Sequence, residues 1–219
     1  MEKWCAPLES RTIQIHCNQN REIVLNIIPG HFATSHSHVN YYIDMTSIKH
    51  HCKIARQAAD FLAQKYMNSV AVDTIVCMDG CEVVGAFLAE ELSKSGIASL
   101  NDGADIKIIT PEYPNGQLLF RDNVQDMIWN KNILLLVASA TTGKTISRSL
   151  DCIRYYGGRI AAISAIFSAI PEINKIKIDS IFTSEDLPNY CTYPVSECPY
   201  CQNGQKIDAI INSFGYSKI

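Results

Sequence analysis

The stretch from residue 133 to residue 145 carries the clearest chemical signal in the sequence. Residues 133–138 are almost continuously apolar, as is typical of a strand buried on both faces, and apolar residues then recur at helical spacing from Thr145. The turn between them is small and hydroxylated. A helix that starts there presents unpaired backbone N–H groups, and its dipole favours a negative charge. The pattern predicts a phosphate-binding loop made of Ala140, Thr141, Thr142, Gly143, Lys144 and Thr145.

Two other interpretations of this loop stay open. It could be an ordinary strand-to-helix turn in which a threonine caps the helix. Gly143-Lys144-Thr145 also fits the end of a relaxed Walker A motif, with Ala138 in place of its first glycine. A nucleotide triphosphatase would normally place the loop after its first strand and follow it with an acidic strand end. Here the loop comes late and residues 159–168 contain no acid, which disfavours a triphosphatase.

A second candidate region is the turn Asp79, Gly80, Cys81 and Glu82, which follows the apolar stretch 70–78 and precedes a helical pattern. Carboxylates beside a phosphate site suit Mg²⁺, so magnesium is considered as a cofactor. The alternative, which the sequence favours, is a turn aspartate and a helix-start glutamate. Cys81 is either a low-pKa thiol at a helix start or, as we expect, a buried inert one.

The remaining pattern indicates an α/β fold. A helix is expected over 47–67, started by Ser47, and strands and helices then alternate. Further strands are expected at 106–110, 159–168 and 177–183, with an exposed loop at 111–121. We expect a mostly parallel sheet flanked by helices over residues 1–187, and an irregular, cysteine-containing C-terminal tail over 188–219 packed on it.

The tail contains Cys198 and Cys201 in the spacing of half a zinc knuckle. Cys191, Cys17, His16 or a residue of a second subunit would have to complete such a site. The thiols could instead pack against the core, and we expect no bound metal. The histidine cluster His31, His36 and His38, followed by His50 and His51, is interpreted as a solvated loop.

The composition argues against several classes of protein. Hydrophobic residues make up 47% and charged residues 19% of the 219 residues, as in globular proteins, and the net charge of −3 gives no basic field for nucleic acid. No stretch approaches the ~20 apolar residues of a membrane span. The nine cysteines are scattered and odd in number, unlike a secreted disulfide framework, so a cytoplasmic protein is expected.

Residues 137–145 resemble the phosphoribosyl-pyrophosphate (PRPP) signature of type I phosphoribosyltransferases, an apolar strand with two acids, two variable residues and Thr-Thr-Gly before a helix. Further segments are similar to the orotate phosphoribosyltransferases. These are Gly30-His31-Phe32, Ser37-His38 and Tyr41-Tyr42, then 73–92, and finally 193–204, which is similar to the Cys-Pro-x-Cys tail of one branch.

The resemblance implies a type I phosphoribosyltransferase fold with an N-terminal hood region inside residues 1–187. It also implies a glycosyltransferase of pyrimidine nucleotide biosynthesis that transfers phosphoribose from PRPP to a pyrimidine-like base. PRPP or a nucleotide-like phosphate ligand is then the expected partner, residues 79–82 form the pyrophosphate loop, and a homodimer is expected. No organic cofactor is implied.

The departures from the family pattern fall on catalytic positions. Val137 and Ala138 stand where the family has the two acids that hold the ribose hydroxyls. Arg121 is the only basic residue of the stretch 110–121, which corresponds to the mobile loop that stabilises departing pyrophosphate. Weak or lost transferase activity is therefore expected. The alternative is a non-catalytic regulatory protein that binds a nucleotide or phosphosugar on the same fold.

Overall fold

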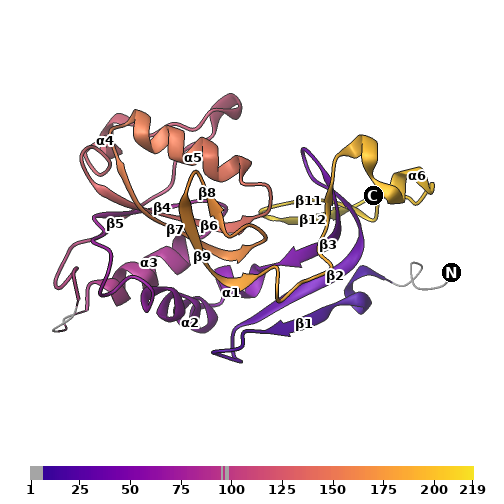
Figure 1. The fold of residues 1–219 in the computed structure, drawn as a ribbon, viewed down its shortest axis with the longest axis horizontal. Helices are drawn as coiled ribbons and strands as arrows, with labels where there is room; N and C mark the ends of the chain where they lie inside the picture. The colour runs from indigo at the N-terminus through magenta and orange to yellow at the C-terminus, as the bar shows by residue number, and fades with distance from the viewer. Residues whose placement is uncertain (1–6, 95, 97–98) are drawn as a thin grey trace.

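The described residues of the computed structural model form two six-stranded sheets, and the one that contains more residues, called the larger sheet, is almost entirely parallel (Figure 1). The structure describes residues 7–94, 96 and 99–219. In spatial order the strands are β5 (Lys107–Ile109), β4 (Thr74–Cys77), β6 (Asn132–Ala140), β7 (Arg159–Ser168), β9 (Ile176–Thr183) and β8 (Glu172–Ile173). The first five run parallel and only β8 pairs in the antiparallel sense. This confirms the predicted mostly parallel sheet.

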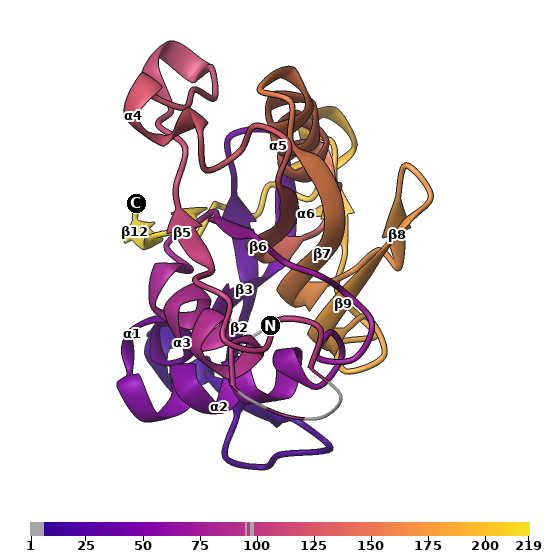
Figure 2. The same ribbon diagram turned by 90° about the vertical axis from the view of Figure 1, so that its left-hand side faces the viewer.

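Helices cover both faces of this sheet (Figure 2). Side chains of α2 (Cys52–Ala63) and α3 (Glu82–Leu92) share one core cluster with Leu134 and Leu136 of β6. On the opposite face, α5 (Lys144–Tyr155) packs against Leu135 and Val137 of the same strand, beside the short α4 (Asp122–Gln125). Because successive side chains of a strand point to opposite faces and both faces are covered, β6 is apolar from Ile133 to Ala138.

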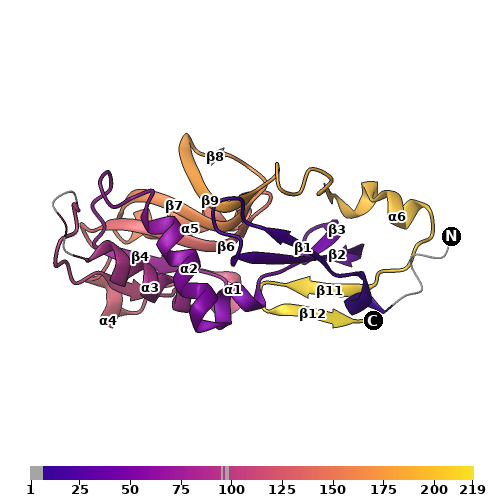
Figure 3. The ribbon, with the colours of Figure 1, turned by 90° about the horizontal axis from the view of Figure 1, so that it is seen from below.

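The smaller sheet combines both ends of the chain (Figure 3). Its strands are β10 (Thr192–Tyr193), β3 (His38–Asp44), β2 (Val24–Ala33), β11 (Ala209–Asn212) and β12 (Gly215–Lys218) in spatial order, with β1 (Ile13–His16) also paired to β2. Three further short elements accompany it, the 3₁₀ helices η1 (Leu8–Arg11) and η3 (Val195–Glu197) and the helix α6 (Pro199–Gln202). We call this sheet and these elements the hood.

The C-terminal tail is therefore more regular than its sequence suggested. Its strand β10 pairs with β3 through Tyr193 and His38, and β11 pairs with β2 through Ala209 and Phe32. Turn-forming residues interrupt these strands so often that none exceeds four residues, which hides them from pattern analysis. The tail covers both edges of the β2–β3 hairpin.

The helix predicted over 47–67 is divided in two. α1 (Thr46–His50) ends at His51, which has an extended backbone and caps α2 instead. Met45, not Ser47, occupies the N-cap position of α1. Both Ile48 and Lys49 of the short α1 are buried.

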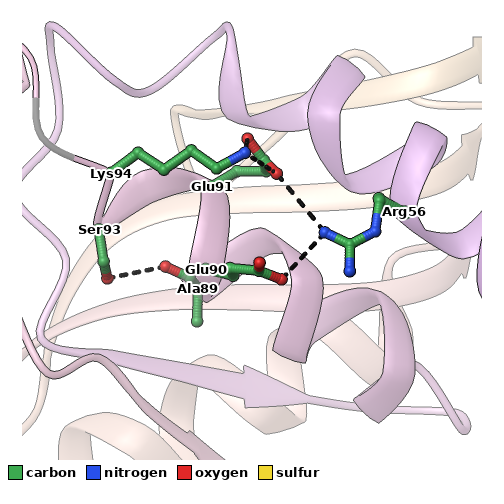
Figure 4. A network of polar contacts seen from close by, with 6 residues as sticks. All are labelled: Arg56, Ala89, Glu90, Glu91, Ser93 and Lys94. Carbon is green, nitrogen blue, oxygen red and sulfur yellow. Dashed lines mark hydrogen bonds and ion pairs between the residues drawn. The ribbon is translucent and has the colours of Figure 1, made fainter.

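The contact between α2 and α3 is apolar inside and charged outside (Figure 4). Arg56 of α2 reaches Glu90 at 3.1 Å and Glu91 at 4.0 Å, and its guanidinium lies 4.2 Å above the Phe87 ring. Exposed ion pairs of this kind contribute about 0–1 kcal/mol each, so the buried apolar contact holds the helices together. None of the helices that the structure describes combines the length and the apolar character needed to span a bilayer.

Candidate functional site

The two predicted loops lie side by side at the carboxyl edge of the larger sheet. β4 and β6 are adjacent and parallel, with Cys77 opposite Leu136, and the amide of Met78 donates to the carbonyl of Leu136 at 2.8 Å. After β4 the chain adds β5 on one side of β4 and then β6 on the other. Ligands of open α/β sheets bind at such a reversal of strand order. We therefore take the position between loop 79–82 and loop 140–145 as the candidate site, and we call it the crevice after this general rule.

The phosphate loop is an uncapped helix start. β6 continues to Ala140, and α5 begins at Lys144 after a bend. Gly143 is the N-cap residue, and no side chain makes a capping hydrogen bond, so the threonine-cap interpretation is wrong. Thr142, Lys144 and Thr145 are exposed. The N-terminal amides of this twelve-residue helix are available to an anion.

Gly143 is required for packing rather than for ligand approach. Its φ of 72° is left-handed, and an added Cβ would lie 2.7 Å from Cδ1 of Ile173 and 3.1 Å from Cδ1 of Ile170. These side chains belong to the segment between β7 and β9. The apolar side chains of Ile170 and Ile173 thus pack against the loop at Gly143, while Thr142 and Thr145 remain exposed to solvent.

The tail also contacts this loop. Burial raises the pKa of Tyr190, while hydrogen bonds with the side chains of Thr192 and Thr141 act in the opposite direction. The ring of Tyr190 packs edge-on against Phe167 of β7, at a centroid distance of 5.5 Å. A residue of the tail therefore holds the Thr141 hydroxyl at one wall of the crevice.

The pyrophosphate loop contains one inert thiol and one exposed carboxylate. Cys81 is fully buried, and burial raises its pKa well above the ordinary value, so it is a protonated thiol. Asp79 and Gly80 both have positive φ, 59° and 76°. Glu82 begins α3 and accepts a hydrogen bond from the Thr110 hydroxyl at 2.9 Å.

A buried lysine that the sequence analysis missed closes this end of the crevice. The Nζ of Lys49, a residue only 4% exposed, donates to the carbonyl oxygens of Asp79 at 3.0 Å and of Ser213 at 2.5 Å. Ser213 lies in the turn between β11 and β12, so the C-terminal hairpin reaches the site. No local pattern of the sequence marks Lys49 as buried, because its partner Ser213 lies 164 residues further along the chain.

The carboxyl group of Asp79 lies in the same polar cluster. Burial raises its pKa, while the Lys49 charge, the Ser213 side chain and the backbone N–H of Ala138 lower it. Burial dominates, so the pKa of Asp79 lies above its ordinary value of 3.8. The backbone of Ala138 thus contacts Asp79 where the family places an acidic side chain.

The other positions expected to act in catalysis do not present a polar side chain to the site that is free to bind a ligand. Val137 is 0% and Ala138 4% exposed, and their side chains belong to the cores on opposite faces of the sheet. Arg121 is exposed but bonded to Glu112 through Nε at 3.0 Å and Nη2 at 2.6 Å, which raises the pKa of Arg121. Its loop folds back on itself, with Glu112 bridged to Leu119 and the 3₁₀ turn η2 (Pro114–Gly116) at its tip.

Asp79 and Glu82 do not form a magnesium site by themselves. Asp79 faces the Lys49 cation and its carboxylate already accepts hydrogen bonds, and Glu82 is engaged by Thr110. Mg²⁺ usually adds substrate phosphate oxygens to one or two carboxylates. Magnesium at this crevice remains a proposal that depends on a bound pyrophosphate group.

The histidine cluster is not a solvated loop, because two of its members are buried beside the tail cysteines. His31 is 0% and His38 5% exposed, and their ring nitrogens converge with the sulfurs of Cys198 and Cys201, all within 4.8 Å of one another. His36, His50 and His51 are exposed, as expected of solvated histidines. Among the residues that the structure describes, Cys17, Cys191 and His16 are not part of this cluster.

Comparison with known proteins agrees with this geometry. No protein-family model matches the chain. A crystal structure of adenine phosphoribosyltransferase from Thermoanaerobacter pseudethanolicus superposes with a TM-score of 0.51 at 14% identity, covering 80% of this chain and 97% of that one. A phosphoribosyltransferase from Corynebacterium diphtheriae gives the same TM-score, 0.51, with 73% of this chain and 91% of that chain covered. The chain therefore has the type I phosphoribosyltransferase fold.

Two proteins that are similar in sequence are both named orotate phosphoribosyltransferase. Orotate phosphoribosyltransferase of Heliobacterium modesticaldum is 22% identical over 179 residues, which cover 81% of this chain and 87% of that protein. That of Helicobacter acinonychis is 26% identical over 151 residues, 68% of each chain. The predicted resemblance is confirmed: the chain is similar to orotate phosphoribosyltransferases, and Val137 and Ala138 stand at the two positions where the PRPP motif has acids.

Asp79→Asn should change how stability depends on pH. A carboxyl group whose pKa is raised above its ordinary 3.8 binds more protons folded than unfolded, so stability is lost as pH rises from that value through the raised pKa. Asparagine does not titrate. The free energy of unfolding of the wild type, minus that of Asp79→Asn, should fall over this interval and then level off, as measured by urea denaturation at a series of pH values.

Asp126→Asn removes one exposed carboxylate outside the site and is the control for the change in net charge. A difference between wild type and Asp79→Asn that grows in favour of the wild type as pH rises would show that attraction to Lys49 outweighs the cost of burial.

Proposed function

We propose that the crevice between loop 79–82 and loop 140–145 binds the 5′-phosphate of PRPP or of a ribonucleotide. The observation that carries the proposal is the uncapped start of α5 at the reversal of strand order. Exposed Thr142 and Thr145 add hydroxyl donors, and Lys144 adds a positive charge. In this arrangement the phosphate lies on the backbone amides of α5 and the ribose extends toward loop 79–82.

The reaction supported by the sequence relatives is transfer of phosphoribose from PRPP to a pyrimidine-like base, as their name, orotate phosphoribosyltransferase, states for them. In this chain the transfer is slow. Val137 and Ala138 have no side-chain oxygen for the ribose hydroxyls, and Arg121 is bonded to Glu112. A homodimer in the cytoplasm, inferred from the resemblance, is part of the same proposal.

A second candidate is a regulatory protein that binds the nucleotide or phosphosugar without converting it. The polar cluster of Lys49, Asp79 and Ser213 favours this candidate. It places a buried cation and a hairpin turn beside the pyrophosphate loop, where a transferase needs room for the leaving group. Both candidates share the phosphate loop and differ only in turnover.

Thr142→Asp should weaken binding of PRPP and of ribose 5-phosphate by about tenfold or more, which corresponds to ~1.4 kcal/mol. The reason is that a carboxylate beside the amides of α5 repels the phosphate and competes for the same donors. Calorimetric titration of both ligands, with ribose as the unphosphorylated comparison, measures the effect. Because Thr142 is exposed, folding should be unaffected.

Ser69→Asp is the matched control, since it adds the same charge at an exposed position before β4, at the opposite edge of the sheet. It should bind both ligands as the wild type does. Equal affinity of Thr142→Asp and wild type, or binding of ribose as tight as that of ribose 5-phosphate, would contradict the proposed phosphate site.

Turnover separates the two candidates. Wild-type protein incubated with PRPP, Mg²⁺ and orotate, uracil or related bases should release pyrophosphate at well below about 1 per second, the lower end of ordinary enzyme rates. Detectable slow release that requires one base would support the transferase. Binding without release would support the regulatory protein, and release at an ordinary rate would show that other side chains replace the missing acids.

A further inference from the structure

We propose that His31, His38, Cys198 and Cys201 bind a structural zinc ion that fastens the C-terminal tail to the hood. Two imidazole nitrogens and two thiol sulfurs form a ligand set that zinc uses in closed, tetrahedral structural sites. The four ligand atoms lie within 4.8 Å of one another, and three of the four residues are buried. This proposal is independent of the function of the phosphate loop.

The distances between ligand atoms fit a tetrahedron around one ion. Nε2 of His31 lies 3.0 Å from Nδ1 of His38 and 3.5 Å and 3.6 Å from the sulfurs of Cys198 and Cys201. The sulfur of Cys201 lies 3.3 Å from Nδ1 of His38. Usual zinc bond lengths give separations of about 3.4 Å between two nitrogens and about 3.8 Å between two sulfurs. Small outward shifts are enough to admit the ion.

The surroundings of His31 set its ring for metal binding. Its Nδ1 lies 3.1 Å from the carbonyl oxygen of Gln205 and 3.2 Å from that of Lys206. Carbonyl oxygens only accept hydrogen bonds, so the proton belongs on Nδ1 and the lone pair of Nε2 points into the cluster. A backbone carbonyl on the second nitrogen is the usual way in which a zinc-ligating histidine is oriented.

The local fold explains why the four side chains meet. His38 is directly opposite Ala33 across the hairpin, and His31 precedes Ala33 by two residues, where the register of the pair shifts between Pro29 and Phe32. The two imidazole rings meet there, with their centroids 4.9 Å apart. Cys198 caps α6 and Cys201 lies one turn later, so both thiols approach from a single tight turn. Proline at the first helical position favours that turn.

A second layer of contacts supports the site. The carboxylate of Asp208 accepts the backbone N–H of His31 at 2.8 Å, and the amide of Asp208 donates to the His31 carbonyl at 2.8 Å. Arg11 holds the same carboxylate at 3.2 Å, and the ring of Tyr200 stacks on His31. Gly30 leaves room for this carboxylate, because an added Cβ would come 2.8 Å from it.

The ion would join parts of the chain that are far apart in sequence. From the ligand turn the chain continues to β11 and β12, whose connecting turn brings the Ser213 carbonyl to Lys49 at the candidate site. Tyr190 precedes the ligand turn in the sequence, and its side chain lies next to Thr141 of the phosphate loop. Zinc binding would therefore stabilise both walls that the tail contributes to the crevice, since the binding free energy of a structural metal is folding free energy.

Metal analysis of the whole 219-residue chain, purified without chelators from zinc-supplemented cells, tests the proposal. We expect close to one zinc ion per chain by mass spectrometry. Removal of the metal should lower the midpoint of thermal unfolding, and addition of Co²⁺ to the metal-free protein should give the visible absorption of a tetrahedral cobalt–thiolate site. Iron in place of zinc, a Cys198–Cys201 disulfide, or absence of both zinc and the cobalt spectrum would overturn it.

Variants test the ligand assignment. Cys201→Ser should lower the zinc affinity at least about tenfold, the lower end of what losing even a second-layer partner costs. The zinc that the protein retains against a competing chelator should fall accordingly. Cys201 is exposed, so the substitution leaves the core intact. Cys191→Ser replaces another exposed thiol of the tail and should retain the metal. Retention of zinc by Cys201→Ser with a folded circular dichroism spectrum, or its loss from Cys191→Ser, would contradict the assignment.

Discussion

Burial of β6 on both faces is the constraint on which the rest of the site depends. From Ile133 to Ala138 its odd-numbered and even-numbered side chains enter two different cores, so a one-residue slip in register would place each set in the wrong core. This fixes where Ala140 ends the strand and where α5 begins. The same burial explains why Val137 and Ala138 are tolerated. Their apolar side chains extend the two cores to the point where related enzymes would expose carboxylates.

A different set of polar groups lies beside the two positions at which this chain has no carboxylates. Lys49, Asp79 and Ser213 come from α1, the turn after β4 and the C-terminal hairpin, and they meet beside the backbone of Ala138. A phosphate loop thus adjoins a buried cation. This combination suits the binding of an anionic ligand, and it explains in physical terms why binding and turnover are separable in this chain.

The sequence was sufficient for the features that depend on local pattern. The parallel strands, the helices α3 and α5 and both loops follow from periodicity and turn residues in consecutive segments. Lys49 and the buried histidines could not be found in this way, because their partners lie more than a hundred residues away in Ser213, Cys198 and Cys201. The strands of the tail were missed for a related reason. Each is short, and each is stabilised by pairing with the β2–β3 hairpin rather than by its own composition.

The most direct test of the central claim is a crystal structure of the protein with ribose 5-phosphate. The phosphate should lie on the backbone amides of residues 142–145 at the start of α5, with the ribose directed toward loop 79–82. This placement would establish the crevice at the strand reversal as the ligand site. A phosphate bound elsewhere on the molecule, or a well-ordered loop whose amides point into the core while the ligand is absent from the crevice, would contradict it.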